Sequence, residues 1–267
     1  MDAAAARQAA HKIGNAAISS GADVARAAAV DQAFAAIADE WWDPAGKFRP
    51  LHQMNSARLE FIRDHLAVHF GRDPLQDKPL KGLKVIDIGC GGGLLAEPLC
   101  RMGADVTGID AGAEAIRVAS HHAKEMDLEI VYRQRSPETL ADEQTSYDAV
   151  LSTEVVEHVA DLEVFLTASA KLVRPGGAMV LSTLNRTLKS LALAKIGAEY
   201  VMRWLPVGTH DWRKFRRPSE LASHIRPHGL EVRALCGMDY YPIDGKWGLS
   251  NRLGVNYLMF ATRNENA

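Results

Sequence analysis

The feature that most constrains the fold is a run of glycines that directly follows a short apolar strand. The pattern at residues 85–88 predicts a buried strand, the next five residues are Gly89-Cys90-Gly91-Gly92-Gly93, and apolar residues at helical spacing follow. Glycines let the backbone turn tightly and approach a ligand closely, and the free amides at the start of a helix favour anionic or polar groups. The order strand, glycine turn, helix therefore predicts a ligand-binding loop.

Strand and helix patterns alternate after this turn. Apolar runs typical of strands lie at residues 85–88, 105–109, 129–132, 147–151, 178–182, 230–235 and 255–261. Helical spacing separates them at residues 94–102, 113–124 and 162–173. Such alternation is typical of a doubly wound α/β fold. We therefore predict a mostly parallel, Rossmann-like sheet of seven strands.

The alternating pattern is predicted to form one domain over residues 30–262. Within it, residues 30–80 read as N-terminal helices, and residues 187–217 interrupt the alternation as a helical insertion after the fifth strand. The Ala-rich residues 1–29 are predicted to be a mobile extension, and residues 263–267 a short tail.

Charge and composition exclude several classes of protein. The chain has 31 Lys and Arg against 33 Asp and Glu, so it lacks the basic excess of most nucleic-acid-binding proteins. No apolar run approaches the ~18 residues of a spanning helix. Three cysteines in no metal-binding spacing indicate a reduced compartment. We expect a cytoplasmic protein, peripheral on the inner face of the membrane, rather than one of the mitochondrial matrix.

Two carboxylates near the glycine run indicate which ligand it binds. Asp110 ends the second strand, where a carboxylate accepts the hydroxyls of a ribose. Gly91, Gly93 and Ala96 formally satisfy the dinucleotide fingerprint, but Asp87 just ahead of them would repel a pyrophosphate. The same carboxylate suits an ammonium or sulfonium group, although a strand-end Asp also caps loop amides. This favours S-adenosylmethionine, which carries both cations and no phosphate.

The resemblance to a known family rests on motifs in order along the chain. They are Asp87-Ile88-Gly89-Cys90-Gly91-Gly92-Gly93, Asp110, Tyr147-Asp148-Ala149-Val150 and Leu172-Val173-Arg174-Pro175-Gly176-Gly177. They look like the motifs of class I S-adenosylmethionine-dependent methyltransferases. Further strings include Trp41-Trp42-Asp43, Pro50-Leu51-His52, Ser182-Thr183-Leu184-Asn185-Arg186, Gly208-Thr209-His210-Asp211 and Asn256-Tyr257. Over residues 30–262, these resemble the ubiquinone-biosynthesis O-methyltransferases, which methylate phenol or catechol hydroxyls of polyprenylated precursors.

The resemblance also implies a set of cofactor contacts. Arg58, Gly89, Asp110 and Thr153 take the family's contact positions, with Arg58 reaching the cofactor carboxylate from an N-terminal helix. Thr153 is a departure, because relatives carry Met there, but a backbone contact tolerates the change. The glycine-loop reasoning adds Asp87, Gly91 and Gly93 as cofactor-binding residues.

A cluster after the fourth strand is the candidate for chemistry at the acceptor hydroxyl. On a helix, Glu154, Glu157 and His158 would fall within about 100° of one face. Such a set could hold Mg²⁺, which would bind a catechol and lower its pKa. Alternatively, His158, with Glu157, acts as the base without a metal. A third reading is structural, with the Glu-His pair only ordering the helix.

Residues 188–217 are the predicted contact with a membrane. On a helical wheel the charged residues of this insertion gather on one arc and apolar residues fill most of the rest, with tryptophans and arginines flanking. The segment reads either as a helix at a bilayer surface or as a lid over the acceptor pocket. The expected partners are a polyprenylated phenol or catechol and a quinone-biosynthesis complex, with no nucleic acid.

Two alternatives to the leading function stay open. One is an O-methyltransferase for another small phenolic acceptor. The other is a non-catalytic, cofactor-binding scaffold of a biosynthetic complex, against which the retained Asp87, Asp110 and Glu157-His158 argue.

Overall fold

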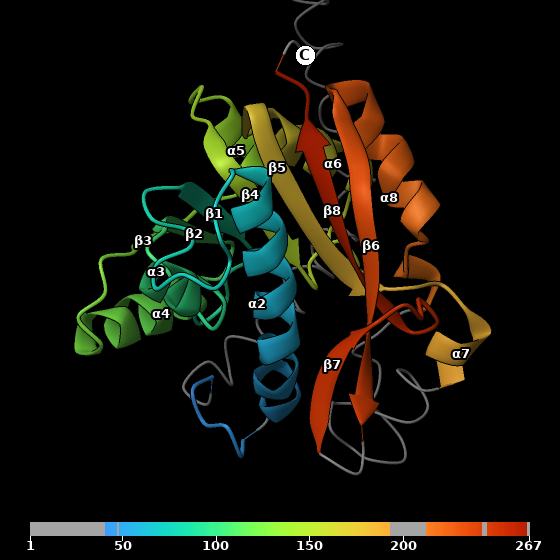
Figure 1. The fold of residues 1–267 in the computed structure, drawn as a ribbon, viewed down its shortest axis with the longest axis horizontal. Helices are drawn as coiled ribbons and strands as arrows, with labels where there is room; N and C mark the ends of the chain where they lie inside the picture. The colour runs from blue at the N-terminus through green and yellow to red at the C-terminus, as the bar shows by residue number, and fades with distance from the viewer. Residues whose placement is uncertain (1–40, 47, 193–211, 242–244, 266–267) are drawn as a thin grey trace, which may run out of the picture.

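The computed structural model describes residues 41–46, 48–192, 212–241 and 245–265. Across them a single sheet has the strand order β3-β2-β1-β4-β5-β8-β6-β7 (Figure 1). The strands are β1 (Lys84–Ile88), β2 (Asp105–Asp110), β3 (Val131–Gln134), β4 (Tyr147–Thr153), β5 (Val173–Leu184), β6 (Leu230–Tyr241), β7 (Lys246–Ser250) and β8 (Asn256–Arg263). The helices are α2 (Arg49–His69), α3 (Ala96–Arg101), α4 (Ala113–Glu125), α5 (Pro137–Ala141), α6 (Leu162–Lys171), α7 (Leu188–Ser190) and α8 (Pro218–Ile225). Two 3₁₀ turns are η3 (Trp212–Lys214) and η4 (Arg226–His228).

The first five strands pair in parallel, with β1 between β2 and β4. Ile88 at the end of β1 is in register with Ile109, and Thr153 at the end of β4 is in register with Ser182 of β5. The carboxyl ends of these strands therefore meet at one edge of the sheet. Open α/β sheets bind ligands at this edge.

Side chains of successive residues in the central strands enter two different cores. Val85 packs against the cluster that contains Phe61 and Leu66 of α2, whereas Ile86 belongs to the cluster that contains Leu166 of α6. The alternation follows from the two-residue period of a strand, and it buries both faces of the sheet. Figure 1 shows α2 in front of the sheet.

The predicted fold class is confirmed, but the number of strands was underestimated. The eighth strand, β7, lies along the chain between the last two predicted strands, at residues 230–235 and 255–261. It pairs antiparallel with the end of β6, and its Trp247 and Leu249 pack against the core on the α2 side. Five residues with a central glycine, Gly248, carry too short an alternation to be recognised. The short helix α5 also escaped prediction.

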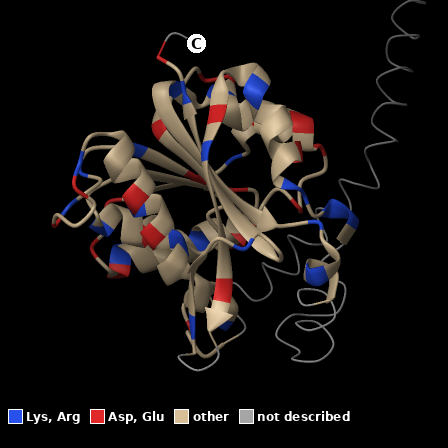
Figure 2. Ribbon diagram, turned by 45° about the vertical axis from the view of Figure 1, so that its right-hand side comes forward, with Lys and Arg blue, Asp and Glu red and all other residues tan. Residues whose placement is uncertain are grey.

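Within residues 30–80, where the sequence predicted N-terminal helices, lies α2, which begins at Arg49 with a proline in its first turn. Residues 30–40, the extension predicted at residues 1–29 and most of the insertion lie outside the described residues. Over the described part of the chain, no helix has both the length and the apolar content needed to cross a membrane. Figure 2 shows acidic and basic residues interspersed over the described helices and strands.

Candidate active site

The glycine loop joins β1 to the turn before α3 at the ligand-binding edge of the sheet. The amides of Gly89 and Cys90 donate to the Ile109 carbonyl at 2.8 and 3.0 Å, which ties the loop to the end of β2. Gly89 has φ +76°, and a Cβ there would lie 2.3 Å from Cγ2 of Val155. Only glycine therefore fits at this position, for reasons of both backbone conformation and space.

Asp110 fastens this loop to the start of α4. Its Oδ2 accepts from the Gly91 amide at 2.9 Å, and its Oδ1 accepts from the Gly112 amide at 2.8 Å. Burial raises the pKa of the Asp110 carboxyl, while these backbone hydrogen bonds lower it. Each carboxylate oxygen has a further lone pair, so the predicted contact with ribose hydroxyls remains compatible with both bonds.

Asp87 and Arg58 form a buried pair of opposite charges beside the loop. Asp87 is 2% exposed, and its Oδ2 has no hydrogen-bond partner among the described residues. Burial, and next the charge of Asp110, raise the pKa of Asp87 to about 7, whereas the charge of Arg58 lowers it. Arg58 is 4% exposed and its Nε likewise lacks a partner within the described chain. A buried acceptor and a buried donor with unused capacity suit a ligand that carries one ammonium and one carboxylate.

Thr153 ends β4 at the same edge and is half-buried. Its backbone pairs with Ser182 of β5. Its role as a backbone contact for the cofactor stays a prediction. The chain then turns sharply, because Glu154 has φ +56°, which is uncommon for a residue with a side chain.

The prediction that Glu154, Glu157 and His158 lie on a helix was wrong. Residues 154–158 form a turn, in which the Glu154 amide donates to the Ser182 carbonyl at 2.9 Å and prolongs the β4–β5 pairing by one residue. Of the valines between them, Val156 is buried and Val155 packs against the same hydrophobic cluster.

The two glutamates differ in environment. The carboxylate of Glu154 accepts from Oγ of Ser182 at 2.7 Å and lies 3.0 Å from Nη2 of Arg58. Glu157 is 4% exposed and accepts from Oγ1 of Thr183 at 2.7 Å. Burial, and next the charge of Glu154, raise the pKa of Glu157 to about 8, so this carboxyl is largely protonated at neutral pH.

The structure does not bring the three predicted ligands together as a metal centre. Among the described residues, no three His, Cys, Asp or Glu side chains form a group that could hold a metal ion. His158 is half-buried, and its amide donates to the Val155 carbonyl at 2.8 Å within the turn. Of the three predicted ligands, Glu154 and Glu157 lie close enough for their charges to interact, since the charge of Glu154, after burial, raises the pKa of Glu157.

Several residues at this edge were not identified as site residues from the sequence. The indole Nε1 of Trp42 donates to the Gly92 carbonyl at 2.9 Å, and Nδ2 of Asn55 donates to the Leu94 carbonyl at 2.7 Å. Both bonds hold the N-terminal segment on the glycine loop. Each joins residues far apart in the chain, so no local periodicity could have found them.

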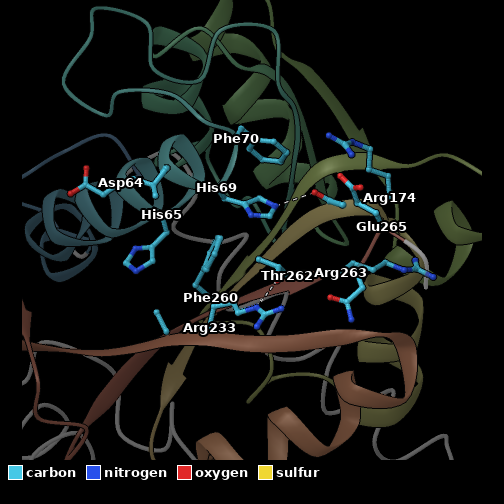
Figure 3. Close-up of a pocket in the computed structure, with 14 residues that line it drawn as sticks. Asp64, His65, His69, Phe70, Arg174, Arg233, Phe260, Thr262, Arg263 and Glu265 are labelled. Atoms are coloured by element: carbon cyan, nitrogen blue, oxygen red, sulfur yellow. Dashed lines mark hydrogen bonds between the residues drawn. The ribbon is translucent and has the colours of Figure 1, made fainter.

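A separate cavity of about 790 Å³ lies between α2 and strands β6 and β8 (Figure 3). His65 and His69 of α2 line one side, and Arg233, Phe260 and Arg263 line the other. None of the predicted site residues lines it. This cavity is therefore distinct from the edge at which the glycine loop, Asp110 and Glu157 meet.

Comparison with known proteins gives close relatives over most of the chain. A family model described as a methyltransferase domain matches residues 51–235. Proteins named ubiquinone biosynthesis O-methyltransferase from Chelativorans sp. (strain BNC1) and Rhizobium rhizogenes are each 51% identical over 230 residues. The matches cover 86% of this chain and 91% and 93% of those proteins.

Solved structures with a similar fold are more distant in sequence. The magnesium protoporphyrin IX methyltransferase of Synechocystis PCC 6803 with bound SAH has a TM-score of 0.55 and 22% identity, covering 77% of this chain and 83% of that one. The PH0226 protein of Pyrococcus horikoshii has a TM-score of 0.57 and 16% identity, covering 84% and 95%. These similarities show that the chain shares its fold with these two proteins.

Proposed function

The chain belongs to the ubiquinone biosynthesis O-methyltransferase family, and from this premise we propose that it methylates a phenol or catechol hydroxyl of a polyprenylated ubiquinone precursor. S-adenosylmethionine is the methyl donor. The single observation that carries the proposal is the 51% identity to relatives of that name over 86% of the chain. The buried pair of Asp87 and Arg58 supports the cofactor, because its charges complement the ammonium and carboxylate of the methionine end.

Methyl transfer from a sulfonium to an oxygen is an in-line displacement, so the chain has to position the acceptor and take its proton. A phenol has a pKa near 10, and only about one in a thousand is ionised at pH 7. Recovering the ionised form is worth about 4 kcal/mol. A general base beside the acceptor is the simplest way for side chains to supply this.

Glu157 and His158 are the proposed catalytic residues. Glu157 lies in the turn directly after β4, and its raised pKa of about 8 makes its ionised form a stronger base than an ordinary carboxylate. His158 follows in the same turn and is half-buried. In this proposal one of the two accepts the hydroxyl proton, and Thr183 holds the Glu157 carboxyl in place through its 2.7 Å hydrogen bond.

A divalent cation is the second way to ionise the acceptor. The proposed donors are the carboxylates of Glu154 and Glu157, and His158 would be the further ligand. Burial, and next the charge of Glu154, raise the pKa of Glu157. Oxygen ligands suit Mg²⁺, which when bound polarises a catechol oxygen. The absence of a three-ligand group among the described residues means that this proposal depends on the carboxylate pair.

Contact with a bilayer is proposed for residues 188–217. The amphipathic charge pattern of the segment supports it, and Leu188, the first residue of α7, is 78% exposed. Residues 193–211 lie outside the described structure. Liposome flotation tests the proposal, because replacing Leu191, Val201 and Trp204 with charged residues should release the protein, and unchanged flotation would refute it.

The decisive experiment is a methyl-transfer assay with S-adenosylmethionine and a short-chain prenylated catechol, run with Mg²⁺ and with a chelator. Product that forms only with Mg²⁺ supports the metal proposal, with Glu154→Gln expected to lower the apparent affinity for Mg²⁺. Product that forms equally in chelator supports a side-chain base, and Glu157→Gln and His158→Gln then identify it by which one lowers kcat at least tenfold. Absence of product despite cofactor binding would favour another phenolic acceptor or a scaffold.

A further inference from the structure

Three buried polar atoms near the glycine loop have unused hydrogen-bonding capacity. Within the described residues, Oδ2 of Asp87, Nε of Arg58 and the indole Nε1 of Trp41 have no hydrogen-bond partner. A buried polar atom without a partner is destabilising, so atoms of this kind at a ligand-binding edge indicate contacts that a ligand completes. The Asp87 oxygen is an acceptor, and the two nitrogens are donors.

Trp41 lies directly on the loop. A Cβ at Gly91 would be 2.5 Å from Cη2 of the Trp41 ring, and a Cβ at Gly92 would be 2.7 Å from its Cγ. The ring stacks on Phe48 with centroids 3.9 Å apart, and the Trp41 carbonyl lies 2.6 Å from Nε2 of His52. Trp41 is 9% exposed. Its ring is therefore held from two sides, whereas its N–H group is left unused.

Trp42 differs from its neighbour in this respect. Its Nε1 donates to the Gly92 carbonyl at 2.9 Å, and its ring stacks on His122 with centroids 3.6 Å apart and planes 7° from parallel. Trp42 therefore fastens the segment to the loop and has no indole hydrogen left for a ligand. Of the adjacent tryptophans, only Trp41 has a donor to offer.

We propose that Trp41 is a further cofactor-binding residue, whose indole N–H donates to the carboxylate at the amino-acid end of S-adenosylmethionine. The three unused atoms match that end of the cofactor, because Asp87 accepts from the ammonium while Arg58 and Trp41 donate to the carboxylate. The proposal concerns cofactor binding and is independent of which acceptor is methylated.

The test compares two ligands by isothermal titration calorimetry on the full chain. S-adenosylhomocysteine carries the amino-acid end, and 5′-methylthioadenosine lacks it. Trp41→Phe keeps an aromatic ring against Gly91 and Phe48 but removes the N–H. It is expected to raise the Kd of S-adenosylhomocysteine about tenfold, as the loss of a hydrogen bond to a charged group predicts, and to leave the Kd of 5′-methylthioadenosine within about twofold.

Trp247→Phe is the matched control. Its indole Nε1 is also buried without a partner in the described chain, and it lies on β7, the last strand in the sheet order, whereas the glycine loop follows β1. This variant is expected to change neither Kd, and the melting temperature of both variants verifies that they fold. Unchanged binding of S-adenosylhomocysteine by Trp41→Phe, or an equal loss for both ligands, would overturn the proposed hydrogen bond. Because no methyl transfer is measured, failure of the proposed acceptor would not affect this result.

Discussion

Nη2 of Arg58 lies 3.0 Å from Oε1 of Glu154, and the two side chains are 5% and 21% exposed. This ion pair joins helix α2 to the turn after β4. The guanidinium also lowers the pKa of Asp87 on β1. One side chain from an N-terminal helix thus links the proposed cofactor contact to the turn that carries the proposed base, Glu157.

Cofactor affinity is expected to rise with pH through Asp87. The pKa of this carboxyl in the ligand-free chain is about 7, and its ionised form is the one that attracts an ammonium group. The Kd of S-adenosylhomocysteine should therefore fall about tenfold between pH 6 and pH 8, as proton linkage requires for a single group. Calorimetric titrations across this range measure the effect. Asp87→Asn should bind more weakly and show a flat profile, and a profile as steep as that of the wild type would exclude Asp87 as the titrating group.

Removing the charge of Arg58 is expected to move that profile to higher pH. The guanidinium lowers the pKa of Asp87, so Arg58→Met should raise this pKa above about 7. The variant should also bind S-adenosylhomocysteine at least about tenfold more weakly at every pH, because a charge-assisted hydrogen bond to its carboxylate is lost. Arg63→Met on the same helix is the control, since Arg63 pairs with Asp64 away from the loop. An unshifted midpoint would contradict the coupling of Arg58 to Asp87.

Two glycines with similar backbone angles separate strain from close packing. Gly89→Ala places a Cβ 2.3 Å from Val155 at φ +76°, whereas Gly71→Ala meets nothing within 4 Å at φ +66°. Gly71→Ala should lower the unfolding free energy by about 1 kcal/mol, because a residue with a Cβ is strained in the left-handed conformation. Gly89→Ala should cost about 3 kcal/mol or more and abolish cofactor binding. Urea unfolding measures the unfolding free energy of both variants. An equal decrease in the two would show that the contact with Val155 does not contribute to the cost at Gly89.

Glu157 is expected to make the protein less stable as pH rises. Its pKa is about 8 in the folded chain, against about 4.3 when unfolded. Between these values the folded form holds a proton that the unfolded form has lost, so the unfolding free energy falls with increasing pH. Glu157→Gln cannot ionise, and its stability relative to the wild type should therefore improve by about 4 kcal/mol between pH 4 and pH 8. Urea unfolding at both pH values tests this, and a constant difference would place the raised pKa elsewhere.

The architecture could be predicted from sequence wherever a local pattern was long enough. The apolar runs of β1, β2, β4 and β5 could each be recognised as strands from their own residues. The glycine loop could be recognised from its composition, because a run of glycines directly after a strand is typical of a tight turn. β7 and α5 were missed for the converse reason, since each has only five residues. The family motifs then predicted the cofactor residues by position.

The turn at residues 154–158 is where the local pattern failed. Glutamates three apart followed by histidine match a helical face, yet the Glu154 amide bonds to Ser182 and its carboxylate pairs with Arg58. Both partners come from elements distant in the chain, and their contacts outweigh a weak local preference for helix.

The sequence by itself determined the fold class, the cofactor loop and the family, because each is encoded in residues close together along the chain. Only the tertiary structure decided which side chains meet. The order of strands places β4 beside β5, which brings Glu157 to Thr183, and the packing of α2 brings Arg58 to Glu154. It also placed Trp41 against Gly91 with its N–H unused. Contacts of this kind join residues that are distant in the chain and depend on how helices and strands pack, so a local sequence pattern does not predict them.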